Sequence, residues 1–378
     1  MRAAEDAFRR NFEEGREVGA ALCVYRDGEE VLSLHGGFRD AARTVPWDGE
    51  TLVLVWSATK GPSSACLLHA MEKAGADLET PVAEFWPGFA ANGKAGITIG
   101  HVMSHRAGLY ALDEAVDIMD RESVERAIER QRPLMPVGEG PAYSPRVFGF
   151  FLDAMTRRLT DGESLGDYWR RVFAEPMDLD FWIGLPENFH SRVATMIAPR
   201  AGETAEADRL FLAAFANANS PTRRSFESPK GFRFAAEMNT ARARLASLPA
   251  TGGIGSAKAL AKFYAMLANG GEWQGRKFFR EETVAWISTK LGQGFDTVLQ
   301  RETAFAAGFM VDPVDAQGKK LREVLGPSLS AFGHAGAGGS LAFADPQCKL
   351  GFAYVMNRME LGVLPHERCL LIVRALDQ

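Results

Sequence analysis

The sequence predicts an α/β (α+β) fold: an antiparallel sheet built from both termini and flanked by helices, with an inserted all-helical region. Two observations support this prediction. Strand-like segments lie near both ends of the 378-residue chain, whereas residues 65–245 mainly show the three- and four-residue apolar spacing of helices. We therefore expect a discontinuous α/β domain of residues 1–64 and 246–378 and a mainly helical domain of residues 65–245.

The N-terminal segment predicts one helix followed by a hairpin. Apolar residues recur every four positions in residues 4–12, which is typical of an amphipathic helix. Residues 19–25 and 31–35 are rich in strand-forming residues and flank an Asp-Gly turn at residues 27–28. The sheet is therefore expected to begin close to the N-terminus.

Further elements follow from periodicity and from turn residues. Helical spacing is found in residues 67–75, 121–131, 146–159, 164–173, 257–267 and 367–376. Strand patterns are found in residues 305–311, 340–344 and 350–356. The glycine-rich residues 252–255 precede a helix but lack the pattern of a phosphate-binding loop, so we interpret them as a tight turn.

The composition is that of an ordinary globular protein. The chain is 46% hydrophobic and 24% charged, with 43 Lys and Arg against 48 Asp and Glu and a net charge of -5. Such a balance provides no basic field for a nucleic acid or an anionic membrane. We expect a small-molecule partner, with no nucleic acid and no membrane, while the oligomeric state stays open.

The sequence also predicts the cellular compartment and the state of the cysteines. No apolar run approaches the ~18 residues of a membrane span, and the N-terminus alternates in charge, so a cytoplasmic location is expected. The four cysteines lie far apart without C-x-x-C spacing, which predicts reduced, buried thiols and no metal site. They are Cys23, Cys66, Cys348 and Cys369.

A Ser-x-x-Lys sequence joins Ser57 to Lys60. A helix starting at Ser57 places the two side chains on one face, with Cβ atoms ~5–6 Å apart. A lysine whose pKa is lowered by burial can accept the proton of a serine that attacks an acyl carbon. Gly61 and Pro62 follow directly, so the first turn is expected to be irregular. Alone, the motif also fits a surface serine that caps a helix.

Two further motifs accompany it: Tyr143-Ser144, and the glycine-rich sequence that begins at His334. The order of the three motifs resembles the serine β-lactamase and penicillin-binding superfamily, and within it the class C β-lactamase-like carboxylesterases of family VIII. Segments that are similar to the same group lie at residues 77–82, 101–109, 250–256 and 350–357.

The resemblance implies catalytic roles for three residues. Ser57 becomes the acylated nucleophile, Lys60 its proton acceptor, and Tyr143 a second proton relay for the leaving group and the deacylating water. A tyrosine acts as a base only if its anion is stabilised, which a lysine ammonium nearby provides. The alternative for Tyr143 is an ordinary half-buried aromatic residue.

The resemblance also implies an edge strand that faces Ser57. Its glycines let substrate lie against the backbone, and we assign Ala337 as the N–H donor that completes an oxyanion hole with Ser57. His334 and Gly336 are the expected substrate-binding residues. His334 is expected to donate to the acyl site or to shape it, unless it only fills the strand face.

Two departures from the β-lactamase pattern affect the expected substrate. Pro145 stands where an asparagine is usual, and His-Ala-Gly at residues 334–336 replaces Lys-Thr-Gly, so groups that grip a β-lactam are missing. We therefore expect a serine hydrolase of short acyl esters, a carboxylesterase, which needs no cofactor and no metal. The alternatives are a β-lactamase, D-amino-acid peptidase, amidase or acyltransferase that uses the same site, or a catalytically silent binding or scaffold protein.

Other chemical motifs are interpreted as structural. Residues 162–166 match Gly-x-Ser-x-Gly, but helical periodicity precedes them, so Ser164 is expected to cap the next helix. His101 and His105 have i, i+4 spacing but lack the third ligand of a zinc site. The basic residues between Arg223 and Arg233 are interpreted as the solvated rim of a loop that could border the cleft. These are Arg223, Arg224, Lys230 and Arg233.

Overall fold

Both ends of the chain meet in one sheet. In the computed structural model, which describes residues 1–200 and 206–376, β1 (Gly19–Arg26) pairs antiparallel with β13 (Leu350–Met356) and with β2 (Glu29–Gly37). The turn between β1 and β2 has positive φ at Asp27 and Gly28, as a two-residue hairpin requires. The predicted hairpin and the predicted sheet from both termini are confirmed.

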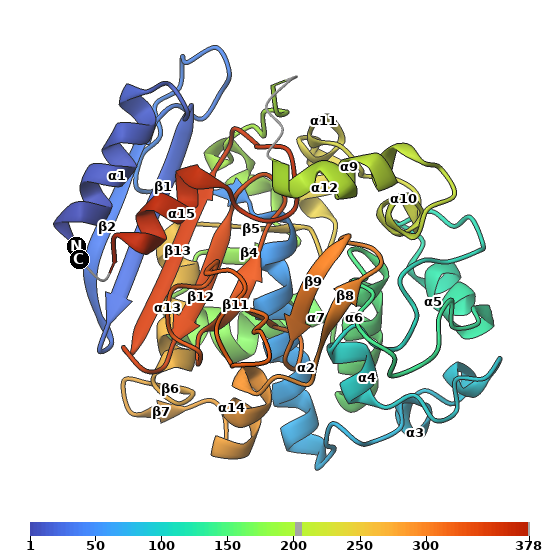
Figure 1. The fold of residues 1–378 in the computed structure, drawn as a ribbon. Coiled ribbons are helices and arrows are strands. Elements are labelled where there is room, and N and C mark those ends of the chain that lie inside the picture. Colours follow the sequence, from blue (N-terminus) through green and yellow to red (C-terminus); the bar gives the residue numbers. More distant parts are fainter. Residues whose placement is uncertain (201–205, 377–378) are drawn as a thin grey trace.

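The full sheet has eight antiparallel strands. The remaining five strands are β8 (Gly292–Asp296), β9 (Arg301–Phe305), β10 (Met310–Val311), β11 (Phe332–Ala335) and β12 (Leu341–Asp345). Their order in the sheet is β2-β1-β13-β12-β11-β10-β9-β8. The helices α1 (Arg2–Glu13) and α15 (Glu367–Arg374) pack together on one face, while α13 (Ala257–Ala268) packs on the other face, against β1, β12 and β13 (Figure 1).

The predicted strand at residues 305–311 is wrong as a single element. The structure divides it into the end of β9 and the start of β10, which pair with each other antiparallel. The chain reverses at Gly308, where φ is +80° and an added Cβ would lie 2.2 Å from the Ser64 hydroxyl oxygen. The apolar pattern of these residues gave no sign of the tight turn, which requires glycine because the neighbouring helix leaves no room for a side chain.

A small second sheet lies beside the nucleophile motif. It joins β3 (Val53–Leu54), β5 (Gly253–Gly255) and β4 (Phe181–Ile183) in that order. The expected tight turn at residues 252–255 is therefore wrong, because most of it is the central strand β5. Its glycines permit close packing, since a Cβ on Gly253 would lie 2.6 Å from the Thr59 hydroxyl oxygen. The proposed boundary between residues 245 and 246 stays a prediction.

The region between β3 and β5 is mainly helical. Its helices are α2 (Lys60–Ala74), α3 (Val82–Phe85), α4 (Ile99–Met103), α5 (Arg121–Arg130), α6 (Val147–Leu159), α7 (Leu165–Trp169), α8 (Glu175–Met177), α9 (Arg209–Ala216), α10 (Pro221–Glu227), α11 (Ala235–Met238) and α12 (Ala241–Leu245). The predicted helix at residues 164–173 is α-helical only to Trp169 and continues as a π-helical turn over Arg170–Ala174. A further helix, α14 (Glu281–Ser288), follows α13 and the short hairpin of β6 (Glu272–Trp273) and β7 (Arg276–Lys277).

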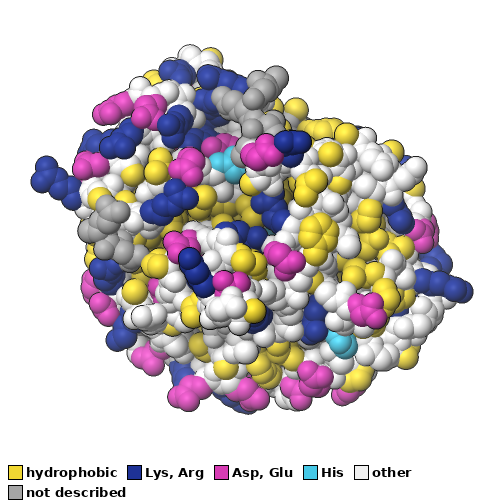
Figure 2. All heavy atoms as spheres, in the orientation of Figure 1, with side chains coloured by type: hydrophobic (Ala, Val, Ile, Leu, Met, Phe, Trp, Pro, Cys, Tyr) yellow, Lys and Arg dark blue, Asp and Glu magenta, His cyan; other side chains and the backbone are white. Residues whose placement is uncertain are grey.

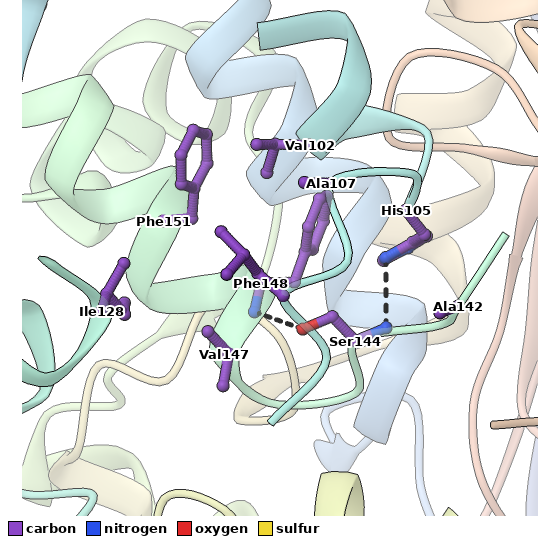
Figure 3. Close-up of a pocket in the computed structure, with 10 residues that line it drawn as sticks. Val102, His105, Ala107, Ile128, Ala142, Ser144, Val147, Phe148 and Phe151 are labelled. Atoms are coloured by element: carbon purple, nitrogen blue, oxygen red, sulfur yellow. Dashed lines mark hydrogen bonds between the residues drawn. The ribbon is translucent and has the colours of Figure 1, made fainter. Parts of the chain in front are cut away.

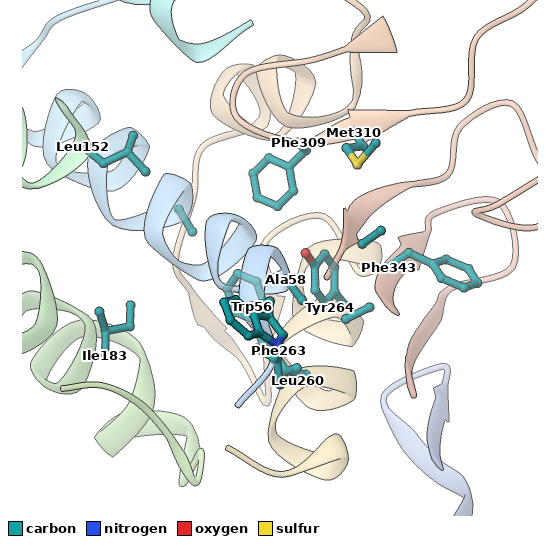
Figure 4. Packing of buried hydrophobic residues seen from close by; sticks show 14 of the residues in the cluster. Trp56, Ala58, Leu152, Ile183, Leu260, Phe263, Tyr264, Phe309, Met310 and Phe343 are labelled. Atoms are coloured by element: carbon teal, nitrogen blue, oxygen red, sulfur yellow. The ribbon is translucent and has the colours of Figure 1, made fainter. Parts of the chain in front are cut away.

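The helix α2 is buried on nearly all sides. Almost every residue from Lys60 to Glu72 is enclosed, which is why the helix carries little amphipathic character. It contacts α6 and α7 on one side and reaches β11 on the other, so it connects the helical region to the large sheet. Figure 4 shows Trp56, Ala58, Tyr264 and Phe309 gathered around its beginning.

Three of the four cysteines are buried, as predicted. Cys23, Cys66 and Cys369 lie in the core, but Cys348 is exposed on the turn between β12 and β13, contrary to the expectation of a buried thiol. In residues 1–200 and 206–376, no helix has both the length and the apolar character that crossing a membrane requires.

The packing between α2 and α13 generates a stability prediction. A Cβ on Gly61 would lie 2.1 Å from the Tyr264 hydroxyl oxygen, which is buried and has no hydrogen-bond partner among the described residues. We expect Gly61→Ala to lower the free energy of unfolding by about 1–3 kcal/mol through overpacking. Tyr264→Phe should be neutral or stabilising, because it removes an unsatisfied hydroxyl.

The double variant Gly61→Ala/Tyr264→Phe is the control, since it removes the clashing atom. Urea unfolding of the four proteins should show that the double variant recovers most of the loss. Equal destabilisation of Gly61→Ala in both backgrounds would contradict the assigned contact.

Candidate active site

The nucleophile motif begins in a strained turn. Residues Trp56–Thr59 form a 3₁₀ turn that leads into α2, so the helix expected to start at Ser57 becomes α-helical only at Lys60. Trp56 has a φ of +48°, which is costly for a residue other than glycine. The Thr59 hydroxyl donates to the Trp56 carbonyl and accepts from the backbone N–H of Gly253 at 2.8 Å. These bonds hold the turn against β5.

The 3₁₀ turn brings Ser57 and Lys60 into contact. Residues three apart eclipse each other in such a turn, and Lys60 Nζ lies 3.1 Å from Ser57 Oγ. The same nitrogen lies 2.9 Å from the carbonyl oxygens of Pro145 and Ala250. The Lys60 side chain thus ends in a cradle of one hydroxyl and two carbonyls.

This cradle fits a neutral amine. Lys60 is fully buried, and burial lowers the pKa of its amine well below 10.5. No carboxylate in the described part of the chain forms an ion pair or hydrogen bond with it. A neutral amine has two N–H donors and one lone pair. With the two donors directed at the carbonyls, the lone pair is left for the hydroxyl proton of Ser57.

Tyr143 lies beside this pair. Its phenol forms a side-chain hydrogen bond with Ser57, and Lys60 Nζ lies 4.9 Å from the centroid of its ring. Burial raises the pKa of Tyr143 above its usual value, Asp296 adds to this rise, and the bond to Ser57 opposes it. Burial therefore favours the neutral form of Tyr143, as it does that of Lys60, and the expected pairing of a tyrosine anion with a lysine ammonium stays a prediction.

Asp296 holds the backbone of Tyr143, and sequence reasoning missed it. Its carboxylate oxygens accept from the Tyr143 N–H at 3.1 and 3.2 Å, and one of them accepts from the N–H groups of Val298 and Leu299. The Thr303 hydroxyl donates to the other oxygen at 3.3 Å. The carboxylate ends β8 and belongs to no motif, so only the fold brings it to Tyr143.

His105 supports the same loop from the other side. Its ring lies between Tyr143 and Phe148, with ring centroids 4.8 and 4.6 Å away, and Nδ1 accepts from the Ser144 N–H. Figure 3 shows this bond and the bond from the Phe148 N–H to the Ser144 hydroxyl at the wall of a small, mainly apolar pocket. Burial lowers the pKa of His105 well below its usual value, so the ring is neutral. The predicted structural role is confirmed.

The third motif faces Ser57, but its strand is not at the edge of the sheet. The expected edge strand is wrong, because β11 lies between β12 and β10. β10 pairs only with Phe332 and Gly333, so the end of β11 keeps one side open. At Gly336 an added Cβ would lie 2.1 Å from the carbonyl oxygen of Val55, two residues before Ser57. Glycine is therefore required where the motif meets the nucleophile turn.

The turn after β11 leaves one N–H available. The N–H groups of Gly336, Gly338 and Gly339 donate to the carbonyls of Ser340, Gly362 and Gly336. The N–H of Ala337 has no backbone or side-chain acceptor within the described residues, and Ala337 lines the same cavity as Ser57. That arrangement suits a donor to a developing oxyanion.

His334 is an acceptor at this site. Its Nδ1 lies 2.7 Å from the Ala335 carbonyl, so Nδ1 carries the proton. Burial, and then Lys60, lower the pKa of His334 to about 3, so Nε2 carries no proton at neutral pH. Nε2 is buried without a partner among the described residues, and the ring centroid lies 6.0 Å from that of Tyr143. This geometry leaves Nε2 as an acceptor, and the expected role of His334, to donate to the acyl site or to shape it, stays a prediction.

A cleft of about 210 Å³ opens beside Ser57. Figure 2 shows a hollow near the centre of this face, lined by hydrophobic side chains and bordered by Lys and Arg side chains. The walls of the cleft are mostly apolar or aromatic, with two arginines. The lining residues are Trp56, Ser57, Pro145, Arg146, Ala198, Pro199, Phe226, Phe232, Arg233, Phe234, Ala235, Thr251, Ala337 and Met359.

The remaining motifs have structural roles. Ser164 accepts from the Asp167 N–H and caps α7, as predicted. His101 completes the cap of α4 with Thr98, and no cluster of three or more metal-ligating side chains occurs in residues 1–200 and 206–376. Of the basic residues between 223 and 233, Arg233 lines the cleft.

The support by Asp296 can be tested. We expect Asp296→Ala to lower kcat by about 10-fold or more, because three backbone N–H groups lose a buried acceptor and the Tyr143 loop shifts. Asp296→Asn retains one acceptor oxygen and should lose less. Steady-state kinetics with both variants, checked for folding by circular dichroism, measures the difference. Equal kcat for wild type and a folded Asp296→Ala variant would contradict the role.

Comparison with known proteins identifies the family of this chain. The Beta-lactamase family model matches residues 5–374. The chain is 33% identical over 358 residues to the esterase/beta-lactamase LipL of Mycobacterium tuberculosis, covering 93% of this chain and 80% of that protein. A crystal structure of a family VIII carboxylesterase superposes with a TM-score of 0.87 at 31% identity, covering 99% of this chain and 95% of that one.

A penicillin-binding protein homologue from Caulobacter crescentus superposes with a TM-score of 0.86 at 32% identity, with the same two coverages of 99% and 95%. The family model spans nearly the whole chain, and the structural match covers 99% of it. The protein therefore belongs to the Beta-lactamase family and is a serine hydrolase of that fold.

Proposed function

We propose that this protein is a carboxylesterase that hydrolyses short acyl esters through an acyl-enzyme on Ser57. The observation that carries the proposal is the buried Lys60 amine, whose two carbonyl partners leave its lone pair for the Ser57 hydroxyl. A serine hydroxyl is a poor nucleophile until a base removes its proton, and this contact supplies the base.

Acylation follows from these positions. Lys60 accepts the Ser57 proton while Oγ bonds to the acyl carbon, and the carbonyl oxygen of the ester becomes an oxyanion. The N–H groups of Ser57 and Ala337 stabilise that charge. Tyr143, neutral in the resting site, gives its proton to the departing alcohol and receives the proton held by Lys60. The products of this step are the free alcohol and the acyl-serine.

Deacylation uses the same groups with water as the nucleophile. As the water oxygen attacks the acyl carbon, the water gives a proton to the Tyr143 oxygen while Tyr143 passes its own proton to the neutral Lys60. Lys60 then returns that proton to Ser57 Oγ as it leaves. One ester and one water are consumed, and one acid and one alcohol are released. No metal or redox partner is needed for the balance of atoms and charge.

The residues beside the nucleophile at positions 145, 334 and 335 favour esters over β-lactams. Pro145 and Ala335 offer no side-chain hydrogen bond, and the neutral His334 presents an acceptor, which does not attract a carboxylate. The name of LipL couples esterase with beta-lactamase, so β-lactam hydrolysis is the second candidate. The two activities share the nucleophile and differ in which groups of the substrate the site binds.

Replacing each serine in turn shows whether Ser57 or Ser164 is the nucleophile. We expect Ser57→Ala to lower kcat for p-nitrophenyl butyrate by about 10⁴-fold or more, with Ser164→Ala retaining wild-type activity. A fluorophosphonate probe followed by intact mass and peptide mapping should label Ser57 alone. Labelling of Ser164, or full activity of Ser57→Ala, would refute the assignment.

The state of Lys60 predicts the pH dependence of the reaction. Only the neutral amine accepts the Ser57 proton, so kcat/KM should rise with pH as Lys60 loses its proton and then level off. Because burial lowers the pKa of Lys60, that rise should end well below pH 10.5. Lys60→Arg stays protonated and should lose about 10³-fold across the whole range. A wild-type profile still rising at pH 10 would be inconsistent with a neutral amine.

Substrate preference is tested on one preparation. We expect kcat/KM for p-nitrophenyl butyrate to exceed that for nitrocefin by about 10³-fold, since two or three contacts of about 1–3 kcal/mol are missing for the lactam. A D-alanyl amide serves as the peptidase control. Comparable rates for nitrocefin and butyrate would favour the second candidate.

A further inference from the structure

We propose that Arg146 is a positioning residue that sets the acyl-chain preference by holding the aromatic wall of the cleft. The inference rests on the proposed esterase function and assigns a role to a residue outside the catalytic motifs. We name residues 226–234 the aromatic wall, because they include Phe226, Phe232 and Phe234, all of which line the cleft.

The guanidinium of Arg146 binds the backbone of this wall at three points. It donates to the carbonyls of Phe226 at 3.2 Å and Phe232 at 3.5 Å, and also to the carbonyl of Gly231. Arg146 is 6% exposed and forms no ion pair with a described carboxylate. Burial lowers its pKa to about 10, so it stays charged at neutral pH and its bonds to the carbonyls are charge-assisted.

The wall needs such a support. Gly231 has a φ of +102° and Phe232 a φ of +49°, and the second value is unfavourable for a residue with a side chain. On the far side of the segment, Lys230 exchanges backbone hydrogen bonds with Val116 and Ile118. Arg146 therefore fixes the wall at three carbonyls, while the Glu237 carboxylate accepts from the Arg233 N–H of the same segment.

Arg146 also connects the wall to the catalytic loop. It follows Pro145, whose carbonyl accepts from Lys60, and Tyr143 stands three residues before it. One short segment thus orients the proton relay and the wall that an acyl chain meets. An acetyl group is too short to gain much from the wall, whereas an octanoyl chain must pack against it.

The test compares ester chain lengths in matched variants. We expect Arg146→Met to lower the ratio of kcat/KM for p-nitrophenyl octanoate to that for p-nitrophenyl acetate by about 10-fold, through a higher KM for the octanoate. Arg244→Met is the control, because Arg244 is also partly buried and donates to a backbone carbonyl, that of His190, but does not line the cleft. Its ratio should equal that of the wild type.

A double-mutant cycle tests whether the change in the octanoate-to-acetate ratio arises from the aromatic wall. Phe232→Ala should lower the same ratio, and Phe232→Ala/Arg146→Met should lower it little further, since both changes remove the same surface. If Arg146→Met fails to fold, Arg146→Lys replaces it, with the same direction and a smaller effect.

Three outcomes would overturn the inference. One is an unchanged chain-length ratio in folded Arg146→Met, and another is full additivity with Phe232→Ala. The third is a loss confined to an anionic ester such as p-nitrophenyl hemisuccinate, which would make Arg146 a direct ligand of substrate charge. Failure of the esterase proposal is distinguishable, because wild type would then hydrolyse neither acetate nor octanoate.

Discussion

The site depends on one amine that is kept out of water. Lys60 ends in a space closed by the carbonyls of Pro145 and Ala250, which come from residues 85 and 190 positions away in the chain. These carbonyls are oriented by the Tyr143 loop and by the segment that leads into β5. The buried α2, the small sheet and the Tyr143 loop must therefore all be in place before the amine meets its serine.

Burial also favours the uncharged forms of the catalytic groups. Desolvation lowers the pKa of Lys60 and His334 and raises that of Tyr143, and each shift is toward the neutral form. Charge then appears only as the reaction proceeds, on the amine and on the acyl oxygen. Backbone N–H groups and carbonyls are already oriented toward both places, which is the arrangement that favours electrostatic catalysis.

Local patterns were enough to predict much of the fold and the candidate nucleophile pair. The hairpin of β1 and β2, the strand β13 and the helix α13 follow from alternation, turn residues and helical spacing, because each is decided by its own residues. The split between β9 and β10 was missed, since it depends on Gly308 fitting against α2. The strand β5 was missed because its glycines look like a turn until Thr59 and Phe181 are packed against them.

The same distinction applies to the site. Ser57, Lys60 and Tyr143 were found from motifs, but Asp296 was not, because a lone aspartate acquires meaning only when the fold brings it to the Tyr143 N–H. His334 was identified, but its direction of hydrogen bonding was left open, since its tautomer depends on the adjacent Ala335 carbonyl. Protonation states depend on desolvation, which a sequence does not display.

The most direct test of the account is an NMR titration of the Lys60 amine. In protein labelled with ¹³C at lysine Cε, the Lys60 resonance can be assigned by comparison with Lys60→Met, and its chemical shift reports protonation. The account predicts that the Lys60 amine loses its proton well below the ordinary lysine pKa of about 10.4. A Lys60 resonance that titrates together with the exposed lysines would contradict the assignment of Lys60 as the base.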